Sequence, residues 1–400
     1  MGKGGEDAVA MLPPPAPCPM RIGIYDDTTP ALLRDASLWN PGPHSLPARQ
    51  PAGVTLAVWR QQGLPEGVYW YDYLLECLGI APDHGRGGGD PGVSFRMIPT
   101  FEEKVLEHRD GHYIVQDWMG AITEISDRYD YTYIRSAKDF VTRKWHRFPV
   151  QTRDDWERMK ERYDPRAPGR FPADFEERCA RMKERTGVAW IYFNGPFWQM
   201  REWCGLEGLC VLMADDPEWV EEMATFWMEF VSQTMAPILE RVELDRVCIS
   251  EDMAYKAHSM ISPAMIRRFL MPCYERWIPE IKKSGCPIID MDSDGYIGEL
   301  IPLWIEAGIN ACCPVEVAAG NDLVEYRRRF GTRMAYTGGI DKRALAKGGA
   351  VMEAELKRVI PPLLKEGGYI PGCDHGVPPD ISWPNFLAYA RLLAQYTGWL

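Results

Sequence analysis

Short apolar segments that end in polar residues recur along the second half of the chain, and each is followed by a longer amphipathic segment. The apolar segments are 189–194, 246–252, 287–294, 308–316, 333–339 and 368–374, and the helix-like segments include 217–242, 263–283, 298–307 and 350–364. This alternation is typical of βα units that form a parallel sheet. Two further expected strands, at 21–25 and 54–59, complete a closed α/β fold, a (β/α)8 TIM barrel. An open doubly wound sheet fits less well, because no dinucleotide fingerprint is present.

The N-terminal half has a different pattern. Residues 1–20 are rich in Pro and Gly without periodicity, which predicts a mobile tail. Between about residues 90 and 150, apolar and polar residues alternate on both sides of a hairpin signal, Asp110-Gly111. We therefore predict a small N-terminal β insertion within a single barrel domain that spans residues 21–400. Residues 152–185 return to helical spacing.

Composition and charge are those of a soluble enzyme. The 400 residues are 46% hydrophobic and 26% charged, and the formal net charge of −12 argues against a nucleic-acid partner, which requires a basic face. No apolar run approaches the roughly 20 residues that cross a bilayer, and the first residues lack the apolar core of a secretory signal. We expect a cytoplasmic protein that does not bind a membrane. The 11 Cys include no CxxC pair, so free thiols are expected.

Polar residues gather at the C-terminal ends of the predicted strands, where the active site of such a barrel lies. They are Asn194, Glu251, Asp252, Asp292, Asp294, Glu316, Asp341, Asp374 and His375. Crowded carboxylates raise one another's pKa and become proton donors, or they bind a metal. Catalytic roles are predicted for Glu251, Asp252, Asp292, Asp294 and His375. Asp292 and Asp294 are two residues apart and are expected to point the same way. The alternative for Asn194, Glu316 and Asp341 is that they cap the following helices.

Four stretches resemble the uroporphyrinogen decarboxylase superfamily: ISEDMAYK (249–256), DSDGYIGELIPLWIEAGIN (292–310), GGIDKRALAKG (338–348) and GGYIPGCDHGVPPDISWPNFLAY (367–389). The resemblance covers residues 185–400 well and the N-terminal half loosely. It implies a (β/α)8 barrel. It also implies one of two activities, either decarboxylation of a porphyrinogen or transfer of a methyl group to or from a corrinoid protein.

Two features separate these activities. The superfamily's decarboxylases bind a polyanionic ring and carry an N-terminal stretch of the type RQAGRY, whereas residues 59–65 here contain one Arg. An acidic barrel mouth also repels a polyanion. The resemblance therefore implies the methyltransferase-like branch, an O-demethylase that moves a methyl group from a small methylated donor, with an aryl methyl ether favoured, to the Co(I) of a partner corrinoid protein. A uroporphyrinogen-type decarboxylase and a non-catalytic barrel that binds a tetrapyrrole or a corrinoid protein are the alternatives, and a homodimer is compatible with each.

The resemblance also implies a zinc site. Superfamily methyltransferases bind zinc through His-x-Cys at one strand end and a Cys at a later one. Asp292-Ser293-Asp294 stands at the first position here and Cys373 at the second, with His375 two residues further on. Cys373, His375 and Asp292 are thus the implied ligands, and zinc accepts such O, N and S donors. The alternatives are a buried structural Cys373 and carboxylates that act as general acids without a metal.

Aromatic residues cluster after the strand at 189–194. The chain contains 15 Trp, and the segment around residues 193–203 is especially aromatic. Asn194, Phe197, Trp198 and Trp203, together with Glu316, are predicted to line a substrate pocket, with the aromatic rings as an apolar wall. The alternative is that Trp198 and Trp203 pack in the core.

Overall fold

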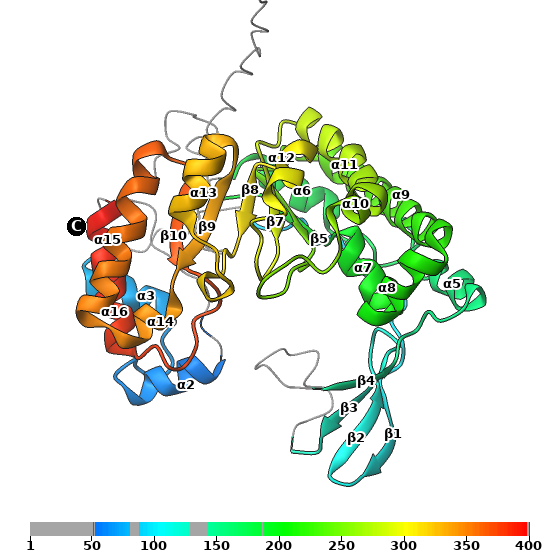
Figure 1. Ribbon diagram of the computed structural model, residues 1–400, viewed down its shortest axis with the longest axis horizontal. Helices are drawn as coiled ribbons and strands as arrows, with labels where there is room; N and C mark the ends of the chain where they lie inside the picture. The colour runs from blue at the N-terminus through cyan, green and yellow to red at the C-terminus, as the bar shows by residue number, and fades with distance from the viewer. Residues whose placement is uncertain (1–50, 52, 81–87, 129–142, 186, 398–399) are drawn as a thin grey trace, which may run out of the picture.

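The structure is a computed structural model that describes residues 51, 53–80, 88–128, 143–185, 187–397 and 400. Its centre is a parallel sheet of six strands in the order β10-β9-β8-β7-β6-β5 (Figure 1). The strands are β5 (Trp190–Asn194), β6 (Arg246–Ser250), β7 (Ile288–Asp292), β8 (Ala311–Cys313), β9 (Ala335–Ile340) and β10 (Tyr369–Cys373). Each overlaps a segment that the apolar pattern predicted as a strand, which confirms the predicted α/β class.

Helices connect consecutive strands, as parallel neighbours require. They are α7 (Pro196–Cys204), α8 (Leu206–Asp215), α9 (Pro217–Arg241), α10 (Pro263–Met265), η2 (Ile266–Leu270), α11 (Met271–Lys283), α12 (Ile301–Ala307), η3 (Val317–Ala319), α13 (Leu323–Phe330), η4 (Gly331–Arg333), α14 (Lys342–Lys347) and α15 (Gly349–Glu366). Helix α16 (Trp383–Thr397) follows the last strand, β10. None of the described helices combines the length and the apolar character that a membrane span requires.

N-terminal residues meet both edges of the six-stranded sheet. Pro51 forms a parallel bridge with Val377, just after β10, and Gly89 forms one with Ala189, just before β5. These are the two positions at which a closed barrel needs its remaining strands. The fold is therefore that of the (β/α)8 class.

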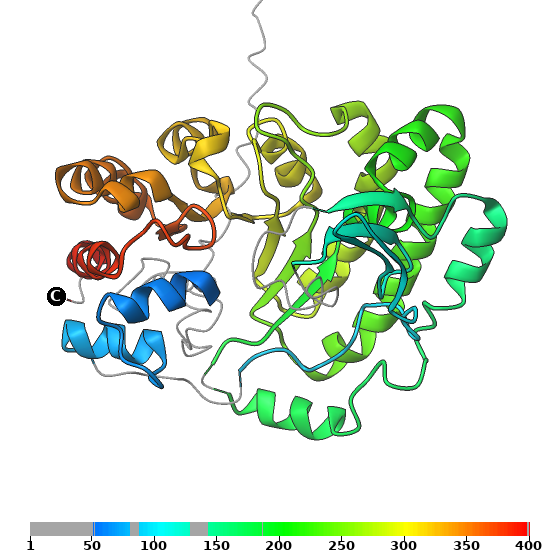
Figure 2. The ribbon, with the colours of Figure 1, turned by 90° about the horizontal axis from the view of Figure 1, so that it is seen from below.

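The strand expected at 54–59 is wrong, because these residues belong to helix α2 (Gly53–Gln61), which α3 (Trp70–Leu78) follows. Thr55 and Trp59 lie one helical turn apart, and both are buried against the C-terminal part of the chain. The Thr55 hydroxyl donates to the Val377 carbonyl (2.8 Å), and Trp59 Nε1 donates to the Ile381 carbonyl (2.7 Å). Figure 2 shows α2 and α3 beside α16. These tertiary contacts override the strand preference of the β-branched residues.

The predicted β insertion is a four-stranded antiparallel sheet in the order β1-β2-β3-β4. Its strands are β1 (Lys104–Arg109), β2 (His112–Gln116), β3 (Ile122–Ser126) and β4 (Lys144–Arg147). The first hairpin turns at Asp110-Gly111 with φ of 50° and 74°, the positive values that a tight two-residue turn requires.

Two helices, α5 (Arg153–Lys160) and α6 (Phe175–Lys183), occupy the predicted helical segment after the insertion. The expected tail at 1–20 and the expected strand at 21–25 lie outside the described residues. The division into a tail and one barrel domain therefore stays a prediction.

Candidate active site at the strand ends

Three polar side chains meet beyond the C-terminal ends of β7, β8 and β10. A carboxylate oxygen of Asp294, one of Glu316 and a ring nitrogen of His375 lie within 4.8 Å of one another. His375 Nε2 is 3.4 Å from Asp294 Oδ2. All three residues are half-buried, so a ligand can reach them. We term Asp294, Glu316 and His375 the strand-end triad.

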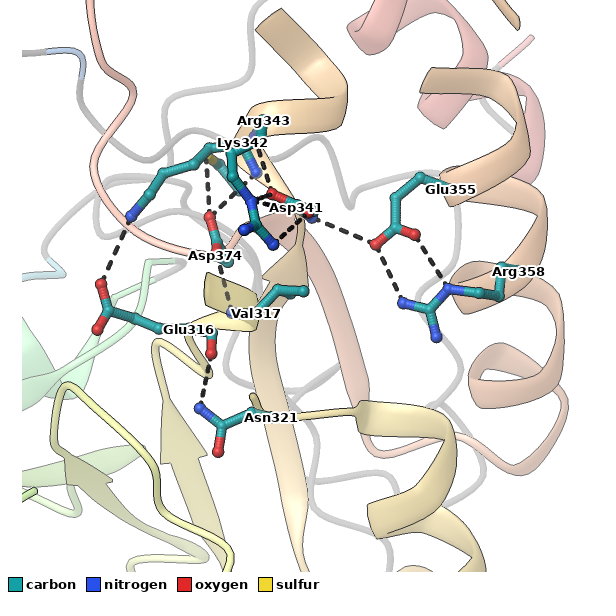
Figure 3. Close-up of polar contacts among 10 residues, drawn as sticks. Glu316, Val317, Asn321, Asp341, Lys342, Arg343, Glu355, Arg358 and Asp374 are labelled. Carbon is teal, nitrogen blue, oxygen red and sulfur yellow. Dashed lines mark hydrogen bonds and ion pairs between the residues drawn. The ribbon is translucent and has the colours of Figure 1, made fainter. Parts of the chain in front are cut away.

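Hydrogen bonds hold Glu316 in place within the triad. Its Oε2 accepts the Gly295 N–H (3.0 Å), and its Oε1 lies 3.5 Å from Lys342 Nζ (Figure 3). Gly295 directly follows Asp294, so this contact ties the end of β7 to the end of β8. The Lys342 ammonium partly neutralises the carboxylate that it faces.

Asp374 connects the loops that carry the triad. Its fully buried carboxylate accepts the backbone N–H groups of Val317 (2.9 Å) and Lys342 (3.2 Å), as Figure 3 shows. Burial raises the pKa of Asp374, whereas the charge of Lys342 opposes the rise. Val317 follows Glu316 and Asp374 precedes His375, so this one carboxylate positions two triad residues. Asp341 lies nearby but caps α14 through the Arg343 N–H (2.8 Å).

Asp252 stands next to the triad in an uncommon backbone conformation. Its φ is 41°, in the left-handed region. Arg201 holds it in place, donating to its carbonyl (2.8 Å) and to its Oδ2 (3.1 Å). Burial raises the pKa of Asp252, Arg201 lowers it, and the charges of Asp294 and Glu316 add to the rise. Asp252 is therefore a carboxyl with a raised pKa beside the triad.

Asp292 is not one of the three residues whose ligand atoms lie within 4.8 Å of one another. Strand β7 ends at Asp292, so the alternation of side chains along a strand does not extend to Asp294. Asp292 accepts from the Ser250 hydroxyl (3.3 Å) and lies 3.9 Å from Cys313 Sγ. Asp290 shares this strand face and lies 3.5 Å from the same sulfur. The sequence reasoning missed Asp290, although the alternation in Ile288–Asp292 places both carboxylates on one face.

Cys373 is 2% exposed and belongs to the hydrophobic core. Its Sγ lies 4.0 Å from Asp374 Oδ1, the carboxylate that holds the loops of the triad. His375 follows the end of β10 and turns to Asp294 instead. Of the ligands implied by the resemblance, His375 belongs to the strand-end triad, whereas Cys373 and Asp292 do not, and that ligand set stays a prediction.

Glu251 lies beneath the first turn of α7 and is fully buried. Its Oε2 accepts the Trp198 N–H (3.0 Å), and its Oε1 accepts the Tyr274 hydroxyl. Burial raises the pKa of Glu251 to about 7. The oxygens of Glu251 are thus engaged with helix α7 and Tyr274, and its catalytic role stays a prediction.

The predicted aromatic wall divides into core and surface residues. Phe197 and Trp203 are fully buried, and Trp203 donates to the Tyr163 hydroxyl (3.1 Å), so both are core residues. Trp198 is half-buried, and the Arg201 guanidinium lies 4.6 Å from its ring centre. Asn194 is also half-buried and donates to Gln199 Oε1 (3.1 Å). Asn194 and Trp198 therefore remain candidates for contact with a substrate.

Glu202 is a carboxylate that the strand-end reasoning missed, because it lies on helix α7. Its Oε1 accepts from Trp198 Nε1 (2.8 Å), and burial raises its pKa. The spacing of Trp198 and Glu202, one helical turn apart, was the available signal in the sequence.

A (β/α)8-type sheet with an acidic strand-end site defines a class of barrel enzymes, and comparison with known proteins gives the family. Residues 146–396 match the uroporphyrinogen decarboxylase (URO-D) family, so the chain belongs to it. Uroporphyrinogen decarboxylase from Nocardia farcinica is 34% identical over 140 residues, which cover 34% of this chain and 38% of that protein. Uroporphyrinogen decarboxylase from Bacillus cereus is 28% identical over 142 residues, which again cover 34% of this chain and 38% of that protein. The chain thus spans less than two fifths of the length of these relatives. A solved structure, a methyltransferase from Methanosarcina mazei, aligns with a TM-score of 0.46 at 15% identity over 66% of this chain and 74% of that one.

Proposed function

We propose that this enzyme transfers a methyl group from a small methylated donor, with an aryl methyl ether favoured, to the Co(I) of a partner corrinoid protein. The observation that carries the proposal is the strand-end triad, with its two carboxylates and one imidazole beside Asp252. The reduced corrinoid supplies the nucleophile, so the chain itself needs none. The chain must instead bind the donor and stabilise the oxygen that leaves when the methyl–oxygen bond breaks.

Asp252 and His375 can stabilise the oxygen that leaves when the methyl–oxygen bond breaks. Burial raises the pKa of Asp252, which makes its carboxyl a better proton donor to an oxygen that gains charge than an exposed Asp would be. His375 lies 3.4 Å from Asp294, and this contact orients the imidazole ring. Trp198, above Arg201, offers an aromatic surface for the donor beside Asp252.

The triad also fits a zinc ion by its chemistry. Asp294, Glu316 and His375 provide two oxygens and one nitrogen, and three protein ligands with one open position are typical of catalytic zinc sites. A bound zinc would supply Lewis acidity to the leaving oxygen. Lys342 faces Glu316 on the other side and would share that carboxylate with the ion.

The relatives favour a second candidate, decarboxylation of uroporphyrinogen, the activity in their names. Against it stands the acidity of the triad and Asp252, since carboxylates repel a substrate that itself carries many carboxylates. The acidic site therefore supports the methyl-transfer proposal.

The test mixes the protein with a reduced corrinoid protein and a panel of methoxyarenes, methylamines and betaines, and follows methylation of the corrinoid by absorbance. Methylation with a methoxyarene is expected. Asp294→Asn should lower the rate by about 10²–10⁴. The matched control is Asp341→Asn, since Asp341 caps α14 and Asn is an equally good cap. No methylation with any donor, together with formation of coproporphyrinogen from uroporphyrinogen, would establish the decarboxylase instead.

A further inference from the structure

A cavity of about 250 Å³ lies away from the strand ends, between the β1–β4 sheet and helix α5. In Figure 1 this sheet projects from the body of the protein, and α5 lies on the body beside it. Three arginines line the cavity, Arg147 from β4 and Arg158 and Arg162 from α5 and the turn after it. Asp155 is the one carboxylate among the lining residues.

Asp155 does not neutralise all three arginines, because its two oxygens are already engaged. Its Oδ2 accepts the Thr152 N–H (3.1 Å) as part of the capping box that begins α5. Its Oδ1 accepts from Arg158 (2.6 Å). Two positive charges, those of Arg147 and Arg162, therefore remain in the cavity.

The two remaining arginines are presented differently. Arg162 is held in place, since its guanidinium lies 3.8 Å from the ring centre of Phe101 and donates to the Pro99 carbonyl (2.7 Å). Arg147 is exposed and forms no ion pair with any residue in the described part of the chain. One fixed and one available guanidinium, both planar forks of donors, suit an anion with several oxygens.

We propose that this cavity binds a phosphate monoester. Two uncompensated positive charges match the charge of a phosphate dianion. The volume of about 250 Å³ is below the roughly 300–1,000 Å³ of pockets for drug-sized ligands, so the ligand is a small metabolite. Because the arginines come from β4 on one side and from α5 and the following turn on the other, the bound phosphate holds the inserted sheet against the barrel.

Calorimetric titration of the full chain with glycerol phosphate tests the proposal, with inorganic phosphate and succinate as separate arms and NaCl to keep the ionic strength constant. The wild type should bind glycerol phosphate saturably, with a Kd on the order of 1 mM or tighter. Arg147→Gln should weaken binding by about 10- to 100-fold, because a charge-assisted contact is lost. Arg147→Lys keeps the charge but loses the planar fork of donors, so its Kd should lie between those of the wild type and Arg147→Gln.

Arg109→Gln is the matched control. Arg109 also lies on the inserted sheet, at the end of β1, but pairs with Glu107 (3.4 Å) and does not line the cavity. Its replacement removes the same charge and should leave the Kd within about twofold. Equal weakening by Arg109→Gln and Arg147→Gln, saturable binding of succinate alone, or no saturable binding at all would each overturn the proposal.

Discussion

Glu251 makes the stability of the protein depend on pH, and Glu251→Gln should remove that dependence. The carboxyl is fully buried, and burial raises its pKa from 4.5 to about 7 in the folded protein. In the unfolded chain the group ionises near 4.5, so the folded state binds the extra proton between these values. The stabilisation from this proton is complete below pH 4.5 and is lost as the pH rises toward 7.

The size of the effect follows from the pKa shift. The rise from 4.5 to about 7 corresponds to about 3 kcal/mol, at roughly 1.4 kcal/mol for each pKa unit. Gln is neutral at every pH and lacks this contribution. Its oxygen can still accept the Trp198 N–H, and its NH₂ can donate to the Tyr274 hydroxyl, so the fold is expected to persist.

Urea unfolding at pH 5, 6, 7 and 8 measures the difference in the free energy of unfolding between wild type and Glu251→Gln. Wild type should lose stability relative to the variant as the pH rises from about 5 to 8, by up to about 3 kcal/mol. Asp117, whose pKa burial raises to about 6, titrates in both proteins and cancels in the difference. Exposed Glu353→Gln should follow the wild type. Parallel curves for wild type and Glu251→Gln would refute the reasoning.

Three further changes test the site and its supports. Gly195→Ala should lower the free energy of unfolding by about 1–3 kcal/mol in the same urea assay, because the added Cβ would overlap the Glu251 carboxylate. Gly208→Ala in α8 has room for the Cβ and should raise the free energy of unfolding by about 0.5–1 kcal/mol. Asp374→Asn should cost about 1–3 kcal/mol in thermal unfolding, since one of two backbone N–H groups loses its acceptor. In elemental analysis, His375→Ala should lose the zinc that the triad is proposed to hold, and Cys373→Ala should keep it; loss of zinc from both variants would instead support the ligand set implied by the sequence.

The strands of the barrel were predictable because they are buried on both faces. Segments such as Ile288–Asp292 and Tyr369–Cys373 are short apolar runs, and their polar ends mark where each strand stops. Helix α2 was not predictable in the same way. Its buried residues, Thr55 and Trp59, are fixed by hydrogen bonds to residues more than 300 positions away, and such partners leave no local pattern.

The sequence predicted that the candidate site lies at the strand ends, but not where each side chain of the site lies. Strand-end position correctly indicated Asp294, Glu316 and His375, which the structure brings together. It could not show that Asp292 lies beside Ser250 and Cys313, because the direction of side chains along a strand holds only while the strand continues. Each residue of the strand-end triad lies in a loop just past its strand, and the course of that loop depends on contacts such as those of Asp374.

The charge around the triad bears on which donor the proposed transferase accepts. Three carboxylates, from Asp252, Asp294 and Glu316, face two cations, Arg201 and Lys342. The two cations offset part of this negative charge, and burial raises the pKa of Asp252. Such a site gives a cationic methylamine or betaine little electrostatic advantage, and a zinc bound to the triad would repel it. A neutral aryl methyl ether would enter without this cost, and Asp252, His375 or a bound zinc would stabilise the charge that develops on its oxygen as the methyl group leaves. The charges around the triad therefore support the proposed neutral ether over a cationic methyl donor.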